Sequence, residues 1–212
     1  MNFKIFATLG LIISGFSFYN SQKLHCKDPN LEKAVLENFD LNKNGSLEQP
    51  EANQIVNLFL AQKNITSTDD LALFKNAKMI VLDDNAIPAI SISGMEHLEL
   101  FSCTGCKVSL FKAENLKKLT ALYLDNNLLE NISLKETPKI DQLTLSLNQL
   151  KTIDITPLRN LRKLNIEHNR IQKLDISGNS LLQTLNVGGN GIKETDIRKG
   201  IKTDVTIFGT EE

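Results

Sequence analysis

The chain has 212 residues, with 24 Lys and Arg against 25 Asp and Glu and a formal net charge of −1. This balance excludes the basic surplus that is typical of nucleic-acid-binding proteins, and no long acidic run indicates a solvated tail. The length allows one or two domains. The chain has 3 Cys, so at least one thiol has no partner for a disulfide within the chain.

The N-terminal segment, 1–21, has the features of a secretory signal peptide. Lys4 supplies the charged start, and an apolar run over 5–13 is followed by small and polar residues. The run is too short to cross a bilayer, which takes about 20 apolar residues. We therefore expect the segment 1–21 to be removed and the mature protein to be secreted or periplasmic. The alternative is a buried N-terminal helix.

A polar loop at 40–51 matches the pattern D-x-[DN]-x-[DN]-G-x5-E of the EF-hand calcium loop. Gly45 allows the sharp turn that this loop needs. The candidate oxygen ligands for calcium are Asp40, Asn42, Asn44, Ser46, Glu48 and Glu51. The segment 30–54 thus resembles an EF-hand, and the resemblance implies one bound calcium ion. The loop is fused to a cap rather than to a second hand, which favours a structural ion over a sensor.

The segment around this loop is expected to be helical, and we assign 22–54 to a helical cap. Apolar residues at helical spacing predict a helix before the loop: Leu31, Val35, Leu36 and Phe39. Pro50 and a strand near Leu58 leave room for only a short exit helix. EF-hands usually come in pairs, whereas one loop is present here. The alternative is therefore a polar turn that caps the following domain without metal.

From Ala77 onward the chain repeats one pattern in constant steps of 21, and the copies start at Ala77, Leu98, Leu119, Ile140, Leu161 and Leu182. The third copy has Leu at 119, 122, 124 and 129 and Asn at 127, which is the leucine-rich-repeat pattern. Because alternate strand residues point to opposite faces, Leu122 and Leu124 are expected to point inward. A coil of this length is too short for a full helix on its return side, where we expect extended or 3-10 structure.

A column of polar residues follows the predicted strands and consists of Asn85, Cys106, Asn127, Asn148, Asn169 and Asn190. The chain turns inward there, so its backbone groups lose water and need hydrogen-bond partners. An Asn side chain offers both donors and an acceptor. We therefore expect these residues to form a structural ladder from coil to coil.

The repeats resemble the short-repeat leucine-rich-repeat proteins exported by bacteria, including the internalin-like group. The resemblance rests on the repeats and on return turns such as 174–179, and covers about 55–208. We predict an α/β-type, mainly β solenoid, right-handed and curved, with about eight short parallel strands on its concave side and the small EF-hand-like cap. The last strand is predicted over 204–208, where Val205 and Ile207 follow Leu185 and Val187 with a step of 20, before a polar tail at 209–212.

The resemblance implies binding of a protein or cell-surface ligand rather than catalysis. The charge balance predicts that no nucleic acid is bound. Outward residues on the predicted concave face include aromatic and aliphatic side chains in a polar surround, which is typical of an interaction site. We expect the ligand to contact Phe59, Val81, Leu100, Tyr123, Leu147, Asn165, Glu167 and His168. The alternative is a structural spacer of the cell envelope or matrix that binds nothing on this face.

Two further signals do not point to an enzyme. Cys103 and Cys106 have the spacing of a redox motif, but they occupy an inward strand position and the Asn column. A disulfide between them, or with Cys26, stays open. The three His residues are scattered, and no nucleophile with a base and no pair of carboxylates emerges.

Overall fold

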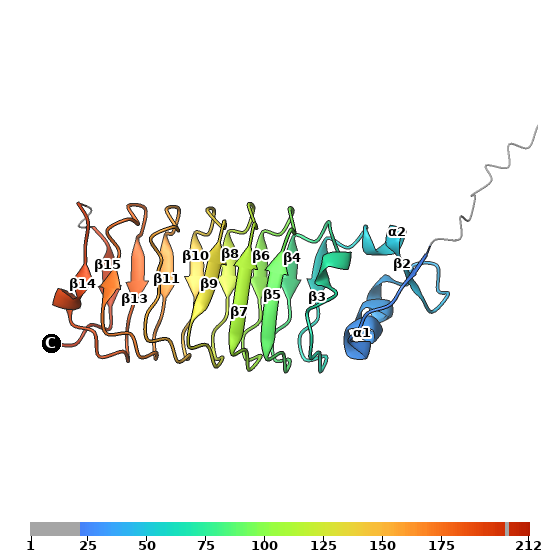
Figure 1. Cartoon of the computed structure of the whole chain (residues 1–212), viewed down its shortest axis with the longest axis horizontal. Coiled ribbons are helices and arrows are strands. Elements are labelled where there is room, and N and C mark those ends of the chain that lie inside the picture. The colour runs from blue at the N-terminus through green and yellow to red at the C-terminus, as the bar shows by residue number, and fades with distance from the viewer. Residues whose placement is uncertain (1–21, 202–203) are drawn as a thin grey trace, which may run out of the picture.

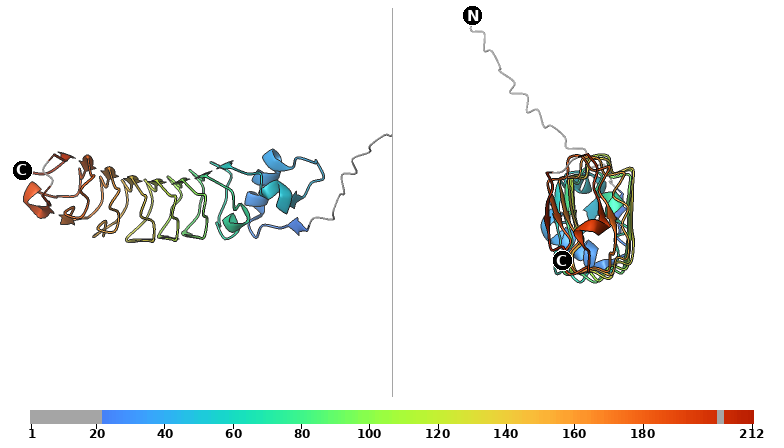
Figure 2. Two further views of the ribbon diagram at one scale, coloured as in Figure 1. Left: turned by 90° about the horizontal axis from the view of Figure 1, so that it is seen from above. Right: turned by 90° about the vertical axis from the view of Figure 1, so that its left-hand side faces the viewer.

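The repeats wind into a solenoid whose coils stack along one axis (Figure 1). The computed structural model describes residues 22–201 and 204–212, so the predicted signal peptide lies outside the described residues. Within the described part, no helix has the length and hydrophobicity needed to cross a bilayer. In the end-on view the coils lie one behind another with nearly the same outline (Figure 2).

One face of the solenoid is an eight-stranded parallel sheet in which each strand pairs with the strands one coil away. Its strands are β3 (Asn57–Phe59), β4 (Met79–Val81), β6 (Leu100–Ser102), β8 (Ala121–Tyr123), β10 (Gln142–Thr144), β11 (Lys163–Asn165), β13 (Thr184–Asn186) and β15 (Thr206–Phe208). The sheet lines the inner side of a shallow curve (Figure 2). The predicted mainly β solenoid with about eight parallel strands is confirmed.

The last strand differs from the prediction by its register. Leu185 pairs with Ile207, so the final step is 22, from 207−185, and not 20. The strand begins at Thr206, and Val205 precedes it as part of the connection from the previous coil. The predicted step of 20 set Val205 opposite Leu185, whereas the connection is longer here and moves the paired residue by two positions.

The other face carries short extended segments and no α-helix in the described solenoid, as the short coil predicts. Three of these segments form a parallel sheet, β5 (Ala89–Ser93), β7 (Leu110–Glu114) and β9 (Ile132–Lys135), and two more pair near the C-terminal end, β12 (Leu174–Asp175) and β14 (Ile197–Arg198). Two 3-10 turns complete this side in the described chain, η1 (Leu71–Leu73) and η2 (Glu194–Asp196).

The core lies between the two faces and runs through every coil. Inward strand residues such as Leu122 and Leu124 are fully buried, and each such aliphatic side chain contributes roughly 1.5–3 kcal/mol. Across the core, the rings of Phe101 on β6 and Phe111 on β7 lie 5.9 Å apart. No coil can enclose this core alone, so neighbouring coils stabilise each other.

The N-terminal cap consists of β1 (Lys23–Leu24), α1 (Pro29–Phe39), β2 (Leu47–Glu48) and α2 (Gln49–Ala52). The buried face of α1 is formed by Leu31, Ala34 and Val35, which belong to the same hydrophobic cluster as the solenoid core. Leu36 and Phe39 are only partly buried, because the i, i+3, i+4 stripe runs through Ala34 instead.

One core position is occupied by a hydroxyl that has no partner among the described residues. Thr137 is buried and its Oγ1 makes no hydrogen bond there, while the same column holds Leu116 and Leu158 one coil away on either side. We expect Thr137→Val to raise the free energy of unfolding by about 1 kcal/mol, because a buried polar group without a partner is costly. Thermal unfolding measures this. Thr120→Val is the matched control, since Thr120 Oγ1 donates to Glu99 O at 3.0 Å and its loss should destabilise.

Candidate functional site

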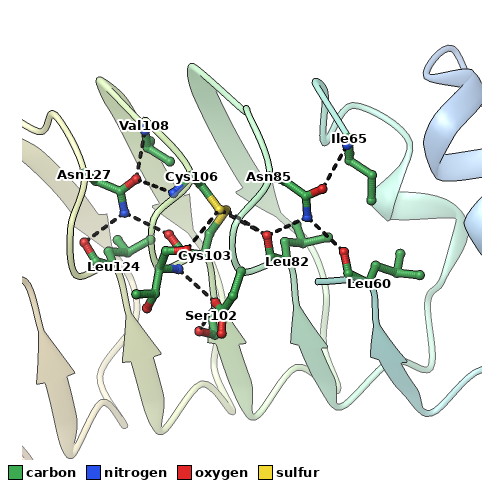
Figure 3. The surroundings of a disulfide bond; sticks show 12 residues. Leu60, Ile65, Leu82, Asn85, Ser102, Cys103, Cys106, Val108, Leu124 and Asn127 are labelled. Atoms are coloured by element: carbon green, nitrogen blue, oxygen red, sulfur yellow. Dashed lines mark hydrogen bonds between the residues drawn. A yellow bond between two sulfur atoms is a disulfide. The ribbon is translucent and has the colours of Figure 1, made fainter. Parts of the chain in front are cut away.

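The Asn column lies on the inner side of the turns that follow the strands (Figure 3). Asn127 shows how each side chain reaches the neighbouring coil. Its Oδ1 accepts from Cys106 N at 3.0 Å and Val108 N at 2.9 Å, and its Nδ2 donates to Cys103 O at 2.8 Å and Leu124 O at 3.0 Å. The side chain therefore joins two successive coils through backbone groups that are shielded from water.

The same arrangement recurs in the neighbouring coils. Asn148, Asn169 and Asn190 each donate to the carbonyls of their own coil and the preceding one, and each accepts a backbone N–H of the preceding coil. Asn85 does the same toward the first coil, where it binds Leu60 O and Ile65 N. Each Asn thus supplies polar partners to turns that enter the core.

Cys106 departs from this pattern because it forms a disulfide with Cys103. In the preceding coil and the four that follow, the backbone N–H at the position of Ile87 donates to an Asn side chain. Ile87 N instead donates to the carbonyl of Cys106 at 2.9 Å. The Sγ of Cys106 lies 3.1 Å from Leu82 O, where a ladder amide would otherwise donate (Figure 3). The backbone of Cys106 has taken over the acceptor role, and the disulfide fills the space of the amide.

The third cysteine, Cys26, is a free buried thiol in the cap. Burial, followed by the charges of Asp70, Glu32 and Asp28, raises the pKa of Cys26 to about 12. A thiol with such a pKa stays protonated and unreactive at neutral pH. The disulfide question that the sequence left open is thus resolved in favour of Cys103 and Cys106, both of which are fully buried.

The candidate calcium loop connects α1 to α2 and is closed by hydrogen bonds from backbone N–H groups. Asp40 accepts from Asn44 N at 3.1 Å and from Gly45 N at 2.8 Å. Asn42 Oδ1 accepts from Asn44 N at 3.0 Å, and Asn44 Oδ1 accepts from Ser46 N at 2.8 Å. The side-chain oxygens at these first loop positions therefore point to the inside of one turn.

Two glutamates complete the loop, and each is only 6% exposed. Glu48 accepts from the amides of Asn44 at 2.7 Å and Asn42 at 3.0 Å. Glu51 accepts from Leu41 N at 2.9 Å, Asn42 N at 3.3 Å and Glu48 N at 3.1 Å. The bond from Asn44 lowers the pKa of Glu48 below its ordinary value, although burial opposes this. Both glutamates are thus held as buried acceptors.

No group of three or more His, Cys, Asp or Glu side chains lies close enough to hold a metal anywhere in 22–201 and 204–212. The loop carboxylates are satisfied by N–H donors, and the ion pairs of the described chain include none of Asp40, Glu48 and Glu51. Carboxylate and amide oxygens are the ligand types that calcium takes in proteins. Glu48 would have to exchange its two amide donors for the ion.

The single loop finds a strand partner outside itself. β2, which contains Glu48, pairs antiparallel with β1, and the register sets Leu24 opposite Leu47. A segment that precedes α1 therefore occupies the edge of the loop, where a second loop would pair in a two-handed arrangement. Leu47 is fully buried as a result. β1 has two residues, too few to show the alternation by which a strand is recognised in a sequence.

The predicted ligand residues divide into two groups in the structure. Phe59, Val81, Leu100, Tyr123 and Asn165 lie at outward positions of β3, β4, β6, β8 and β11. Phe59 is 58% exposed, and the others are partly buried by their neighbours on the sheet. The Tyr123 hydroxyl donates to Gln142 at 3.1 Å, so its ring lies across the next strand.

Leu147, Glu167 and His168 lie beyond the ends of the strands. Leu147 and His168 have φ values of 55° and 51°, in the left-handed region, and form the turns that leave the sheet. Alternation along a strand does not continue through a residue with positive φ. These two side chains therefore belong to the rim of the face. Glu167 directly follows the inward residue Ile166 and is partly buried at the strand end.

Other residues on this face were not among the predicted ligand contacts. Met79 lies outward on β4 beside Val81, and Phe208 on β15 is 51% exposed. Asp83 and Asp125 accept hydrogen bonds from hydroxyls of the next coil, Ser102 Oγ at 2.6 Å and Thr144 Oγ1 at 2.5 Å. Strand alternation could have identified Met79, Asp83, Asp125 and Phe208, because each stands an even number of residues from another outward residue of its coil.

Comparison with known proteins supports the fold. No protein-family model and no curated protein sequence matches the chain. Among solved structures, the functional domain of InlJ from Listeria monocytogenes, which includes a cysteine ladder, is 20% identical with a TM-score of 0.61 over 86% of this chain. Internalin C2 from the same species is 18% identical with a TM-score of 0.56 over 87% of this chain. The fold is an internalin-like leucine-rich-repeat solenoid.

The two neighbours differ in how much of their own length is matched. The chain spans 44% of the InlJ domain but 92% of the internalin C2 chain. At this level of identity the likeness concerns the fold. In the described part of this chain, the polar column holds a Cys at one position only, Cys106.

Proposed function

We propose that this protein is an exported recognition module that binds a protein or cell-surface ligand on its concave sheet. The observation that carries the proposal is the cluster of apolar side chains at outward positions of adjacent strands, with Phe59 the most exposed of them. Apolar and aromatic side chains grouped on an otherwise polar face favour association with a partner. The internalin-like fold supports binding over catalysis by analogy.

A test of this proposal uses a photo-crosslinking amino acid at Tyr123 and, as the matched control, at Lys112. Both positions are in the middle of the solenoid, but Lys112 is exposed on β7 of the opposite face. We expect cell-surface proteins to be crosslinked from position 123 and not from 112. Equal or exclusive crosslinking from position 112 would assign binding to the convex side.

Substitution of the same residue tests the energetic contribution of the face. We expect Tyr123→Ala to weaken binding of the crosslinked partner by about tenfold or more, as central aromatic contacts do, with little change in melting temperature because the side chain lies outside the core. Lys135→Ala is the control, since Lys135 is exposed on β9 and pairs with Glu114 at 2.8 Å. Binding is measured by surface plasmon resonance on both variants. Loss of binding in Lys135→Ala alone contradicts the proposal.

The second candidate is a spacer of the cell envelope that uses the solenoid only for its length. The polar half of the inner face favours it, because β10, β11 and β13 present Gln, Thr, Lys and Asn side chains outward. The apolar half, over β3, β4, β6 and β8, has no purpose in a spacer. We therefore place recognition first, and the crosslinking experiment separates the two candidates.

We further propose that the cap binds one structural calcium ion in the loop at 40–51. Asp40, Glu48 and Glu51 bring three carboxylates into one loop without an ion-pair partner among the described residues. The residues that would hold the ion are those of the loop motif, through carboxylate and amide oxygens and the carbonyl of Ser46. A cation bound by these residues would join the end of α1 to the start of α2.

Calcium is expected to raise the melting temperature of the protein, and EGTA to lower it. Extracellular modules of this kind bind at roughly 10⁻⁴–10⁻³ M, and binding to the folded state alone stabilises it by about 2.7 kcal/mol at a hundredfold excess over Kd. Glu51→Gln should abolish the calcium effect, whereas Glu130→Gln, an exposed residue of the solenoid, should retain it. Titration calorimetry without any heat up to millimolar calcium contradicts the site.

A further inference from the structure

The apolar residues of the inner face are concentrated in its N-terminal half. We call Phe59, Met79, Val81, Leu100 and Tyr123 the apolar patch; they occupy outward positions of β3, β4, β6 and β8. These four strands are neighbours in the sheet, so the side chains form one surface. In the C-terminal half the corresponding positions are polar until Phe208 at the last strand.

Carboxylates follow two of these strands, β4 and β8. Asp83, Asp84 and Asp125, which we call the acidic border, lie just after the inward residues that follow β4 and β8. Two of them are fixed beside the patch by bonds to outward side chains: Asp83 Oδ1 accepts from Ser102 Oγ at 2.6 Å, and Asp125 Oδ2 accepts from Thr144 Oγ1 at 2.5 Å. Both hydroxyls belong to the residues that flank Tyr123 on the neighbouring strands.

The acidic border has no cationic partner within the described part of the chain. None of the ion pairs found there includes Asp83, Asp84 or Asp125. Asp84 accepts the neutral Gln62 amide at 3.2 Å. The one charged residue at an outward position of the eight described strands is Lys163, in the other half of the face. The patch is thus bordered by negative charge.

The carboxylates are also held in place before any partner arrives. Asp83 accepts a second bond from Thr104 N at 2.9 Å, and Asp125 accepts from Ser146 N at 2.7 Å and from its hydroxyl at 2.6 Å. A charge fixed by hydrogen bonds loses little conformational freedom on binding. At Asp83 these bonds do not require a carboxylate, because both reach Oδ1 and an amide oxygen can accept them. The bonds to Asp125 reach both of its oxygens, Oδ2 from Thr144 and Oδ1 from Ser146. The charge itself remains available to a partner.

From this juxtaposition we propose that the N-terminal half of the inner face binds a basic protein segment, one that carries apolar side chains beside Lys or Arg. This deepens the proposed function and rests on it. The apolar side chains pack on the patch, and the cationic groups meet the acidic border. Charge complementarity of this kind selects the partner and raises the association rate more than it adds affinity.

Two synthetic peptides test the chemistry of the partner directly. They share their Leu, Phe and Val positions and differ only in carrying Lys or Glu between them. Fluorescence anisotropy with the whole protein is expected to show binding of the Lys peptide and at least about tenfold weaker binding of the Glu peptide at low salt. The affinity for the Lys peptide should fall as ionic strength rises, because exposed charges are screened.

A triple variant, Asp83→Asn with Asp84→Asn and Asp125→Asn, removes the charge and keeps one accepting oxygen at each position. At position 125 that oxygen can still accept from Ser146, and the amide NH2 can donate to the Thr144 hydroxyl, which accepts as well as donates. We expect it to weaken binding of the Lys peptide about tenfold while the melting temperature stays near that of the wild type. The matched control removes the same charge from exposed residues outside the sheet face, as Glu96→Gln, Glu130→Gln and Glu136→Gln. It should bind the Lys peptide as the wild type does.

Each result decides the proposal. A Lys peptide that fails to bind, a Glu peptide that binds as tightly, or equal loss in both triple variants overturns it. Crosslinking from position 123 distinguishes this failure from that of the proposed function. If the inner face still crosslinks a surface protein in the Asp-to-Asn variant with undiminished yield, the face binds a partner that is not basic. If position 123 crosslinks nothing, the binding face itself is wrong.

Discussion

Asn127→Ala is expected to lower the free energy of unfolding by about 3 kcal/mol or more. The substitution removes the acceptor of Cys106 N and Val108 N and the donor to Cys103 O and Leu124 O. Each of these four residues is fully buried, so water cannot replace the lost amide without opening the coil. An unpaired buried backbone group costs about 1–3 kcal/mol, and two N–H donors are orphaned at once.

The measurement is thermal and denaturant unfolding, together with hydrogen exchange, which should increase first in the coils around 103–129. The matched control is Asn126→Gly. Asn126 is exposed and has a φ of 54°, which Gly adopts freely. Ala is unsuitable at this position, because the left-handed conformation costs it about 1–2 kcal/mol, whereas Asn and Gly tolerate this conformation. Equal loss of stability in the two variants contradicts the ladder argument.

The fold was predictable because its information is periodic. A constant step with Leu at fixed positions specifies which residues point inward, and every residue from Ala77 to Leu182 that opens a repeat is fully buried. The same step fixes the pairing of strands, as the register of Leu122 with Leu143 shows. Because the same positions recur in six copies, one atypical residue in a strand does not obscure the assignment of that strand.

Prediction failed where the period ends or where the chain leaves it. The longer final step lies in the connection to Ile207, where no later repeat corrects the register. Leu147 has an exposed side chain but a positive φ that no feature of its residue type indicates, so it was placed on the strand face. β1 and β2 pair over only two residues each, and strands this short have no recognisable alternation of apolar and polar residues.

The disulfide could not be derived from the sequence, since three cysteines allow several pairings. The neighbouring Asn residues explain how the column tolerates a disulfide at Cys106. Asn85 and Asn127 satisfy the turns on either side, and the carbonyl of Cys106 binds Ile87 N in place of a side chain. A position of the Asn column can therefore lack an amide side chain where a backbone carbonyl accepts the hydrogen bond in its place.

The attachment of the cap to the solenoid depends strongly on Asp28, which is 3% exposed. Its Oδ1 accepts from Asn30 N at 2.8 Å and Leu31 N at 3.1 Å, which caps the N-terminus of α1. Its Oδ2 accepts from Thr66 N at 2.6 Å and Thr66 Oγ1 at 2.9 Å in the first coil, and Ser67 N donates to the same oxygen. One carboxylate thus joins a helix to a distant segment of the chain.

Asp28→Ala is expected to lower the free energy of unfolding by about 3 kcal/mol, of which the lost helix cap accounts for about 1 and the orphaned N–H groups of Thr66 and Ser67 for the rest. Hydrogen exchange should increase first in 23–55. The control is Asp69→Asn, which removes an exposed pair with Lys27 at 3.5 Å and should change stability by less than about 1 kcal/mol.

The contribution of Asp28 should also depend on pH in a defined direction. Burial alone raises the pKa of Asp28, but the hydrogen bonds from Thr66, Leu31 and Ser67 outweigh it and hold the pKa below its ordinary value. A carboxyl with a lowered pKa in the folded state stabilises the fold fully above its unfolded pKa of about 3.9, and this stabilisation is lost as the pH falls through the folded value. The stability difference between wild type and Asp28→Ala should therefore be constant from about pH 5 upward and shrink below about pH 4. A difference that stays unchanged down to the acid limit of folding would show that Asp28 acts through packing and not through its charge.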